Sequence, residues 1–332
     1  MDKVEQPPEK MRCVNIKEKG EWEYTAEKDR PKPKKGEVLI KVERGTIHVS
    51  DVNALKGKYE GFTYPMTAGF EGSGTVVESG GGFSGWRAKG KRVCFVGGSY
   101  AEYAVVNADH CIPLEDDMSW EQGANMFINP LTAVGIVDRV NFHKAKAVIQ
   151  TAAASQVGKM LHKMLTKEGV KVVNVVRREE QVTLLKEQEN CQYVLNSSSD
   201  DYEDKLKELV KELKVSVLID ALAGPTMNQM VPILEMNSVV IMYGFLASEE
   251  VESFNAIHLM AKSIRVEPFF LFGWMGTAGI FKIIGAISAA KKLAKDVTVN
   301  KTFGLHQIQE ALDCYHADMT AGKVFLSPSI TE

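Results

Sequence analysis

The sequence predicts an α/β protein in which a doubly wound parallel sheet is combined with a discontinuous, mostly antiparallel, barrel-like domain. Residues 127–271 alternate apolar strands with helical segments, which is the pattern of a parallel sheet with crossover helices. Residues 11–126 carry short β runs interrupted by glycines, which favours antiparallel strands joined by tight turns. Residues 272–332 end in strand, helix and strand, and we expect them to complete the first domain.

The barrel-like domain is predicted from three β runs, EVLIKVERGTI, GSGTVVESGGG and RVCFVGGSYAEYAVV. The parallel sheet is predicted from KAVIQ, KVVNVV, QYVLN, VSVLIDAL and SVVIMYG, with SIRVEPFF closing it. Helices are expected near SWEQGANMF, from Pro130 to Val140, and over DYEDKLKELVKEL, where Leu206, Leu209 and Leu213 share one face. The segment GWMGTAGIFKIIGAISAAKKLA predicts one long helix.

Composition excludes several classes of protein. With 332 residues, 45% of them hydrophobic and 25% charged, the chain has the make-up of a soluble two-domain protein. The net charge is −3 and the basic residues are scattered along the sequence, so we expect neither nucleic acid nor a membrane as a partner. The five cysteines include no CxxC pair, which disfavours a disulfide framework or a structural zinc site.

The first ten residues are polar and contain two prolines, so we expect a disordered tail over residues 1–10 and no secretory signal. A cytoplasmic location follows by default, and a mitochondrial one stays open if a transit peptide is missing from the sequence. The stretch from Phe269 to Phe281 is far shorter than the roughly 20 apolar residues that cross a bilayer.

The most informative segment lies between the strands KAVIQ and KVVNVV. It has the layout of a dinucleotide-binding turn, although a standard fingerprint would place glycines at 153, 155 and 158, where this chain has Ala153, Ser155 and Gly158. Backbone amides at the start of the following helix would hold a pyrophosphate. An ordinary helix N-cap at Ser155 is the alternative.

Two arginines follow the second of these strands. An acidic residue is expected there when the cofactor carries a free ribose 2′-hydroxyl, but the chain has Arg177 and Arg178. Guanidinium groups match phosphate geometry, which favours NADP over NAD. The alternative is that both arginines lie on a solvated helix start and pair with Glu179 or Glu180.

The chain resembles the medium-chain dehydrogenase/reductase superfamily, and within it the zinc-free quinone oxidoreductase and enoyl thioester reductase branches. The motifs that carry the resemblance occur in family order: GTIHVSDVNALKGKY, AGFEGSGTVVESG, GKRV, GSYAEY, INPLTA, AAASQVG, NVVR, IMYG and GKVFL. The resemblance implies a Rossmann-type domain, a GroES-like domain and a homodimer paired through the edge strand SIRVEPFF.

The resemblance also implies that no metal is bound. Zinc members of the superfamily place a cysteine where His48 stands, a histidine where Phe70 stands, and a further cysteine near Ile128. A catalytic zinc needs three protein ligands, and phenylalanine supplies none.

The activity implied is NADPH-dependent hydride transfer to an activated acceptor, namely an enone, a quinone or a 2-enoyl thioester. Tyr59 is expected to donate a proton, His48 to orient or relay a proton, and Asn53 to position the substrate or the nicotinamide. The alternatives are a loop tyrosine bonded to the backbone for Tyr59, a satisfied structural histidine, which is favoured for His48, and a turn residue for Asn53.

The resemblance places the cofactor against residues from five motifs: Thr132, Ala154, Ser155, Gln156, Val157, Gly158, Asn174, Arg177, Arg178, Tyr243, Gly244 and Lys323. For Lys323, expected at a phosphate, an exposed lysine before a strand is equally plausible. Two other functions remain open: a cofactor-binding relative without turnover, and a carbonyl or alcohol dehydrogenase, which the absence of a ligand at Phe70 opposes.

Overall fold

The computed structural model describes residues 8–247 and 256–331, and the chain divides into two compact units. The barrel unit comprises Met1–Ile128 and Lys291–Glu332, and the sheet unit comprises Asn129–Ala290. Most of the tail expected over residues 1–10 lies outside the described residues, and the first strand, β1, begins at Lys10. No helix in the described part of the chain has the length and apolarity that crossing a bilayer requires.

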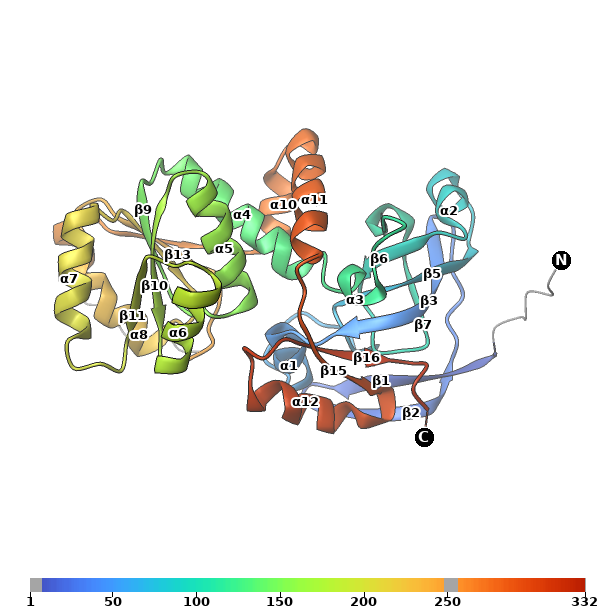
Figure 1. Cartoon of the computed structure of the whole chain (residues 1–332). Helices are drawn as coiled ribbons and strands as arrows, with labels where there is room; N and C mark the ends of the chain where they lie inside the picture. The colour runs from blue at the N-terminus through green and yellow to red at the C-terminus, as the bar shows by residue number, and fades with distance from the viewer. Residues whose placement is uncertain (1–7, 248–255, 332) are drawn as a thin grey trace. The chain divides into compact units, whose positions relative to one another are not determined.

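The barrel unit contains two sheets (Figure 1). The larger follows the order β15-β16-β3-β5-β6-β8, with β7 also paired to β3, and the smaller follows β2-β1-β4. All the pairs are antiparallel except β15 with β16. The strands are β1 Lys10–Glu18, β2 Glu21–Asp29, β3 Glu37–Thr46, β4 Met66–Thr67, β5 Glu71–Ser79, β6 Arg92–Val96, β7 Tyr103–Asn107, β8 Ile112–Pro113, β15 Val299–Gly304 and β16 Lys323–Ser327.

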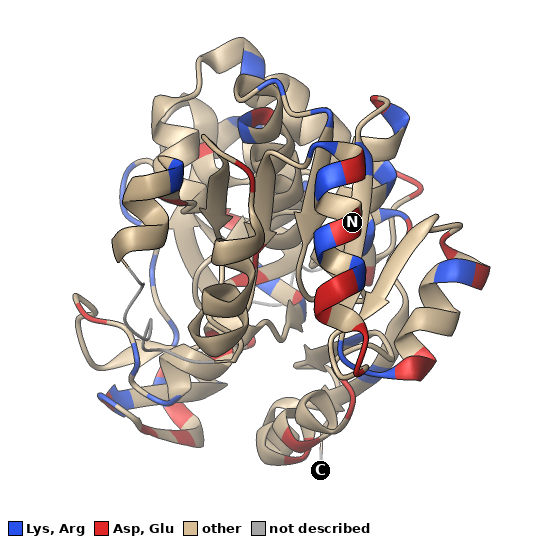
Figure 2. Cartoon of the chain, turned by 90° about the vertical axis from the view of Figure 1, so that its left-hand side faces the viewer, with Lys and Arg blue, Asp and Glu red and all other residues tan. Residues whose placement is uncertain are grey.

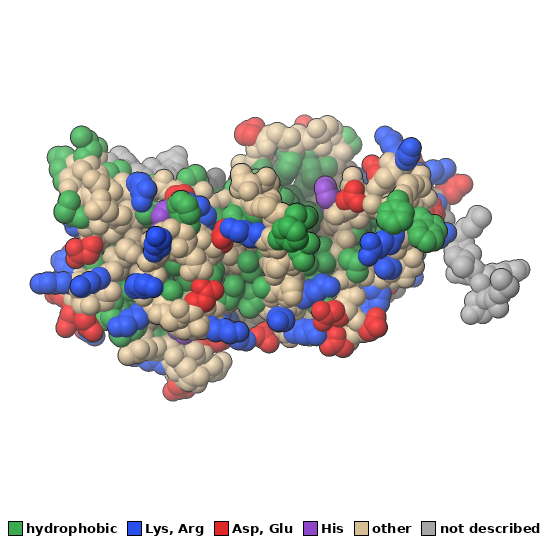
Figure 3. Space-filling model, turned by 90° about the horizontal axis from the view of Figure 1, so that it is seen from above, with side chains coloured by type: hydrophobic (Ala, Val, Ile, Leu, Met, Phe, Trp, Pro, Cys, Tyr) green, Lys and Arg blue, Asp and Glu red, His purple; other side chains and the backbone are tan. Residues whose placement is uncertain are grey.

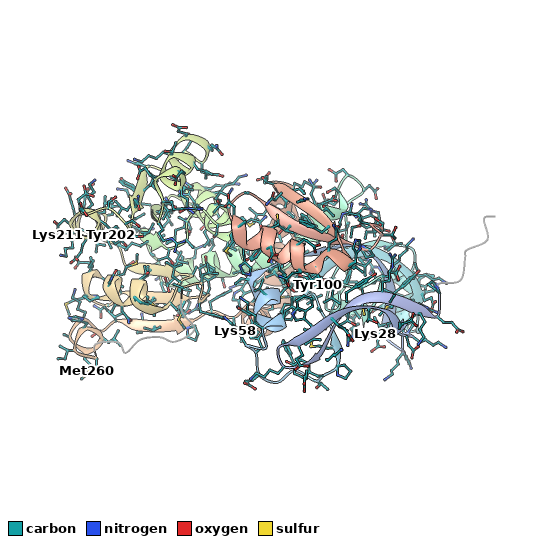
Figure 4. The ribbon with its side chains drawn as sticks, turned by 90° about the horizontal axis from the view of Figure 1, so that it is seen from below. Lys28, Lys58, Tyr100, Tyr202, Lys211 and Met260 are labelled. Carbon is teal, nitrogen blue, oxygen red and sulfur yellow. The ribbon has the colours of Figure 1, made fainter. Side chains whose placement is uncertain are left out.

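The C-terminal segment completes the barrel unit, as the sequence predicts. In the register of β16 against β3, Phe325 faces Thr46. Four helices accompany these sheets: α1 Val49–Leu55, α2 Phe83–Ala88, α3 Trp120–Gly123 and α12 Ile308–Ala317. Tyr100, labelled in Figure 4, is completely buried between these elements, and its hydroxyl donates to the carbonyl of Thr46 at 3.1 Å.

The sheet unit is a six-stranded parallel sheet in the order β11-β10-β9-β12-β13-β14, which is the doubly wound order with its switch point between β9 and β12. The strands are β9 Ala147–Gln150, β10 Lys171–Val176, β11 Tyr193–Asn196, β12 Val217–Asp220, β13 Val239–Met242 and β14 Arg265–Pro268. The helices are α4 Ile128–Phe142, α5 Gln156–Lys167, α6 Glu179–Gln188, α7 Tyr202–Leu213, α8 Gly224–Met230, α9 Ala256–Lys262, α10 Leu271–Thr277 and α11 Ile280–Ala294. Every predicted strand of this sheet is present, so the expected fold class is confirmed.

Helix α7 shows how an amphipathic pattern sets the packing. Leu206, Val210 and Leu213 are buried, while Leu209 is half-buried. The charged residues lie on the outer side, as Figure 2 shows for the helix that faces the viewer, and Lys207 pairs with Glu203 at 2.6 Å. The inward face is therefore set by a spacing of three and four residues.

The prediction of one long helix over residues 273–294 is wrong. The chain forms α10 and α11 instead, because Ala278 is extended (ψ 134°) and ends the first helix. Trp274 of α10 and Lys282 of α11 both donate to Asp138 of α4, at 2.9 and 2.7 Å. These contacts tie both helices to the sheet unit, which ends at Ala290, whereas we expected its end at residue 271.

Candidate functional site

A buried chain of polar side chains joins α1, β5 and β16 in the barrel unit. Nζ of Lys323 lies 3.0 Å from Nδ1 of His48, and Nε2 of His48 lies 2.9 Å from Oε2 of Glu71. The three residues are 8%, 3% and 0% exposed. Since a lysine ammonium only donates, Nδ1 of His48 accepts, which leaves the Nε2 hydrogen to be donated to Glu71.

Glu71 holds the segment that leads into α4. Its Oε1 accepts from the backbone N–H of Phe127, and its Oε2 accepts from that of Ile128 at 3.1 Å. The buried carboxylate is thus bonded to donors on both oxygens, which offsets the free-energy cost of removing it from water.

Asp51 lies in the first turn of α1 and fixes its start. Its carboxylate accepts from the backbone N–H of His48 at 2.8 Å and from that of Phe70 at 2.7 Å. Burial nevertheless raises the pKa of Asp51 to about 7. Burial likewise lowers the pKa of Lys323 to about 8, although Glu71 and Asp51 act in the opposite direction. The cluster therefore contains two groups whose charge changes near neutral pH.

The predicted catalytic tyrosine lies in the loop after α1. Tyr59 is half-buried, and its hydroxyl is hydrogen-bonded to the side chain of Asn53. Its ring centroid lies 5.9 Å from that of Phe62 and 6.3 Å from that of Phe70. Burial raises the pKa of Tyr59, partly opposed by the bond from Asn53, so the hydroxyl keeps its proton at neutral pH. The structure thus brings Tyr59 and Asn53 together, while His48 is engaged with Lys323 and Glu71.

The residues at this place do not fit a zinc ion. Phe70 supplies no ligand atom, and both ring nitrogens of His48 are engaged by Lys323 and Glu71. The Lys323 ammonium would also repel a cation next to His48. No group of three or more His, Cys, Asp or Glu side chains able to hold a metal occurs within residues 8–247 and 256–331.

The placement of Lys323 differs from both sequence-based interpretations. It was expected either at a cofactor phosphate or exposed before a strand, but its side chain is buried and bonded to His48. Burial follows because Lys323 begins β16, which pairs with both β15 and β3 inside the larger sheet.

In the sheet unit, the dinucleotide-type turn follows β9 and packs against β10. The backbone N–H of Ala153 donates to the carbonyl of Val175 at 3.2 Å, and Ala152 adopts a positive φ of 50°. Ser155 caps α5 by accepting from the N–H of Gly158 at 3.1 Å. A Cβ at Gly158 would lie 2.5 Å from the carbonyl oxygen of Ala153. This close approach explains why glycine is needed at 158.

Two alanines precede the cap residue Ser155, and Ala153 stands at the first fingerprint position. Ala153 and Ala154 are 0% and 3% exposed, and they pack in a cluster with Val176 and Leu185. Their methyl groups fill the interior. The backbone amides of Ala154, Gln156 and Val157 lie at or just before the start of α5. The orphan N–H groups and the dipole of a helix N-terminus suit a pyrophosphate.

The two arginines lie at the carboxyl end of β10, next to this turn. Both are exposed, and the backbone N–H of each lies 3.3 Å from Oε1 of Gln181. Ser198, after the neighbouring β11, donates to the carbonyl of Arg177 at 3.0 Å. The carboxylate of Glu179 accepts from Asn196 at 3.0 Å, and Arg177 forms no ion pair with any described residue. The turn and Arg177 thus fit the adenosine end of a dinucleotide with a 2′-phosphate.

Asn174 does not contact the surface of the unit. It is fully buried, accepts from Gln150 at 2.7 Å and donates to the carbonyls of Val172 and Tyr193 at 3.2 and 3.1 Å. Its predicted role at the cofactor is therefore replaced by an internal one, because its position on a central strand points it into the layer beneath the turn. There it supports the carboxyl ends of the strands.

The remaining predicted residues gather around the starts of α4 and α5. Thr132 lies on α4, whose Asn129 donates to the side chain of Gln156 at 2.7 Å. Tyr243, after β13, is hydrogen-bonded to Ser155, and burial raises its pKa. A Cβ at Gly244 would lie 2.8 Å from the carbonyl oxygen of Ala221, so the backbone passes closely there.

The residues that support the switch point were not predicted from the sequence. Thr151 donates to Asp220 at 2.8 Å and accepts from the N–H of Ala221 at 2.8 Å. The other oxygen of Asp220 accepts from the N–H of Ala223 at 2.7 Å. An acid at the end of the apolar run VSVLID was the available signal, since a buried carboxylate must be hydrogen-bonded.

Comparison with known proteins agrees with this geometry. Residues 34–116 match the model of the alcohol dehydrogenase GroES-like domain, and residues 157–289 match that of the zinc-binding dehydrogenase family. Quinone oxidoreductase of Rattus norvegicus is 30% identical over 73% of this chain and 74% of its own length. The mitochondrial enoyl-acyl-carrier-protein reductase of Caenorhabditis elegans is 26% identical over 73% of this chain and 71% of its own.

Solved structures give the same result. A protein described as an NADPH:quinone reductase from Mesorhizobium loti superposes with a TM-score of 0.89 at 32% identity, and the match covers 97% of this chain and 100% of that one. Both the barrel unit and the sheet unit have their counterparts in this family. The chain therefore belongs to the medium-chain dehydrogenase/reductase superfamily of oxidoreductases, in its quinone oxidoreductase branch.

Proposed function

We propose that this oxidoreductase uses NADPH to reduce an activated acceptor, either a C=C bond conjugated to a carbonyl or a quinone, without a metal ion. The observation that carries the proposal is the exposed Arg177–Arg178 pair at the end of β10, beside the turn that follows β9. A fork of guanidinium donors there selects a ribose 2′-phosphate.

The sheet unit supplies the cofactor site. The backbone amides of Ala154, Gln156 and Val157, at the start of α5, bind the pyrophosphate, while Ser155 and Gly158 shape the turn. Thr132, Tyr243 and Gly244 lie where the nicotinamide end would be held, linked to α5 through the bonds that Gln156 and Ser155 form with Asn129 and Tyr243. When bound, the reduced nicotinamide supplies a hydride to the acceptor.

The barrel unit supplies the proton. Tyr59 keeps its proton at neutral pH and is hydrogen-bonded to Asn53, so it stabilises the developing negative oxygen of the acceptor and supplies a proton. That proton ends on the α-carbon of an alkene or on the oxygen of a quinone. The Lys323–His48–Glu71 chain holds the start of α1 and thereby positions Asn53. His48 acts as a positioning residue rather than a proton donor to substrate.

The acceptor class follows from this set of donors. Reduction of a simple ketone or oxidation of an alcohol becomes harder without a Lewis acid, and the residues around Phe70 do not fit one. Conjugated alkenes and quinones are already electrophilic and need only a hydrogen-bond donor. Relatives described as quinone oxidoreductases and as enoyl reductases support both acceptor types.

The test is NADPH oxidation by the purified chain in a metal chelator, with a small quinone and a short 2-enoyl thioester at equal concentrations. We expect turnover with at least one acceptor and none with a saturated ketone. Consumption of neither acceptor, with NADPH still bound, would instead favour a cofactor-binding protein without turnover.

We also propose a homodimer paired through β14, the edge strand of the parallel sheet, in a cytoplasmic setting. Large apolar side chains are exposed in the segments that flank β14 in the chain. They are Phe270 (68%) and Met260 (80%), and Figure 4 labels Met260. Exposed apolar groups of this size are typical of subunit interfaces. Sedimentation equilibrium showing a monomer at micromolar concentration would contradict the dimer.

A further inference from the structure

Helix α2 of the barrel unit presents two large aromatic side chains to solvent. Phe83 is 75% and Trp86 73% exposed, and their ring centroids are 6.5 Å apart. The other tryptophans, Trp22, Trp120 and Trp274, are buried or half-buried. Figure 3 shows the hydrophobic side chains at the surface over α2, with Lys and Arg side chains around them.

The helix packs with its small residues inward. Gly85 is buried, and a Cβ there would lie 2.5 Å from Oγ of Ser79 on β5. Ala88 packs against the apolar core of the larger sheet. Because the small residues take the inward positions, the aromatic side chains are left outside, which is the reverse of ordinary amphipathic packing.

Basic residues from two segments lie beside these rings. The loop that precedes β3 is joined to the start of α2, since Gly36 N–H donates to the carbonyl of Gly81 at 3.0 Å and Gly80 N–H to that of Glu37 at 3.0 Å. The two segments expose six cationic residues: Lys32, Lys34, Lys35, Arg87, Lys89 and Lys91.

The acidic residues near this cationic cluster are largely occupied. Glu78 pairs with Arg30 at 2.9 Å, and Glu37 accepts from the backbone N–H of Lys34 at 2.8 Å. Asp109, on the 3₁₀ turn after β7, is the exposed acid nearby. The fold therefore gathers a positive excess in a chain whose net charge is −3, although these residues look scattered along the sequence.

We propose that this surface, formed by α2 and the residue 32–36 loop, docks the protein on an anionic lipid bilayer. Phe83 and Trp86 would enter the interfacial region, and the surrounding lysines and arginine would contact the negative headgroups. Aromatic side chains beside basic ones have the composition of interfacial anchors. Single-stranded nucleic acid is the less favoured partner, because it is bound by aromatic residues that line a charged groove.

The test uses the full chain and sedimentation with phosphatidylcholine vesicles, with and without phosphatidylserine. We expect the chain to pellet with the anionic vesicles only. Each cation near the bilayer contributes roughly a fivefold factor in partitioning, so Lys34→Glu/Lys35→Glu should weaken binding by more than about tenfold. Phe83→Ser/Trp86→Ser should weaken it comparably, while the matched control on α7, Lys207→Glu/Lys211→Glu, should change it less than about twofold.

A second measurement reports insertion directly. Tryptophan emission should shift to shorter wavelength on vesicle binding, and Trp86→Phe should abolish the shift while retaining binding. Circular dichroism and thermal melts check that the variants are folded. Equal pelleting with neutral vesicles or no pelleting with anionic vesicles would overturn the proposal, and so would full binding by Lys34→Glu/Lys35→Glu or by Phe83→Ser/Trp86→Ser. Retention by a single-stranded oligonucleotide without vesicle binding, or loss of a dimer in the aromatic variant, would also overturn it.

Discussion

Nζ of Lys323 lies 3.0 Å from Nδ1 of His48, and 275 positions of sequence separate the two residues. This contact makes Nδ1 the acceptor of His48 and directs its Nε2 hydrogen to Glu71. One bond therefore sets the tautomer of His48 and ties α1 to β16. The ammonium stands beside the histidine at the place where zinc members of the superfamily bind their metal.

Replacing the buried lysine should change the pH dependence of stability. The pKa of Lys323 is lowered from 10.5 to about 8 by burial, so between these values the unfolded chain binds more protons than the folded one. The free energy of unfolding of the wild type should therefore rise with pH in this window relative to Lys323→Met. Urea unfolding from pH 8 to pH 10.5 measures the difference.

The exposed Lys41 on β3 offers the matched control, Lys41→Met. Its free energy of unfolding should change with pH in parallel with that of the wild type. If Lys323→Met also differs from the wild type by a constant amount, the amine is not perturbed in the folded state.

Neutralising both arginines after β10 should reverse the cofactor preference. Charge-assisted hydrogen bonds contribute about 1.5–3 kcal/mol, so Arg177→Ser/Arg178→Ser should weaken NADPH binding by roughly 10- to 100-fold. Binding of NADH, which lacks the 2′-phosphate, should stay within about twofold. Fluorescence titration with both cofactors measures the two constants.

Lys171→Ser is the control for this pair, since Lys171 is exposed at the opposite end of the same strand. Equal weakening of both cofactors in the arginine variant would mean that the arginines support the fold instead of recognising phosphate.

Removing the hydroxyl of Tyr59 should slow the chemical step. Tyr59→Phe keeps the ring that packs with Phe62 and Phe70, so thermal stability should change little. Proton donation contributes about 10²-fold or more, and kcat with an unsaturated acceptor should fall by that order while KM stays similar. Steady-state kinetics and a thermal melt provide the two readings, and an unchanged kcat would remove Tyr59 from the mechanism.

Adding one methyl group at Gly158 should disturb the turn. Its Cβ would lie 2.5 Å from the carbonyl oxygen of Ala153, and overpacking of this kind costs about 1–3 kcal/mol. Gly158→Ala should therefore unfold at lower denaturant concentration and bind NADPH more weakly. Gly285→Ala on α11, where a Cβ meets nothing within 4 Å, should be neutral or slightly stabilising. Similar behaviour of the two variants would show that the turn tolerates a side chain.

Local sequence patterns were sufficient for the parallel sheet. Apolar runs such as KAVIQ and SVVIMYG coincide with β9 and β13, because buried parallel strands leave little choice of residue. The turn at Gly158 was also recognisable, since its backbone constraint is local.

Contacts between residues far apart in the sequence could not be predicted from local patterns. Lys323 looked like a phosphate ligand or a surface lysine, and only its pairing with a histidine far away in sequence makes it part of a buried cluster. Glu71 and Asp51 were overlooked for the same reason. Helix α1 was hidden among β runs, and the break between α10 and α11 rests on one extended residue, Ala278.

The most direct test of the central claim follows the transferred hydrogen. NADPH deuterated at both C4 positions would be incubated with the enzyme and a short 2-enoyl thioester or enone, and the product analysed by mass spectrometry and NMR. NADPH-dependent reduction predicts a saturated product that carries one deuterium, on the carbon β to the carbonyl. Deuterium at another position of the alkene product, or no reduction of any activated alkene or quinone while NADPH is bound, would contradict it.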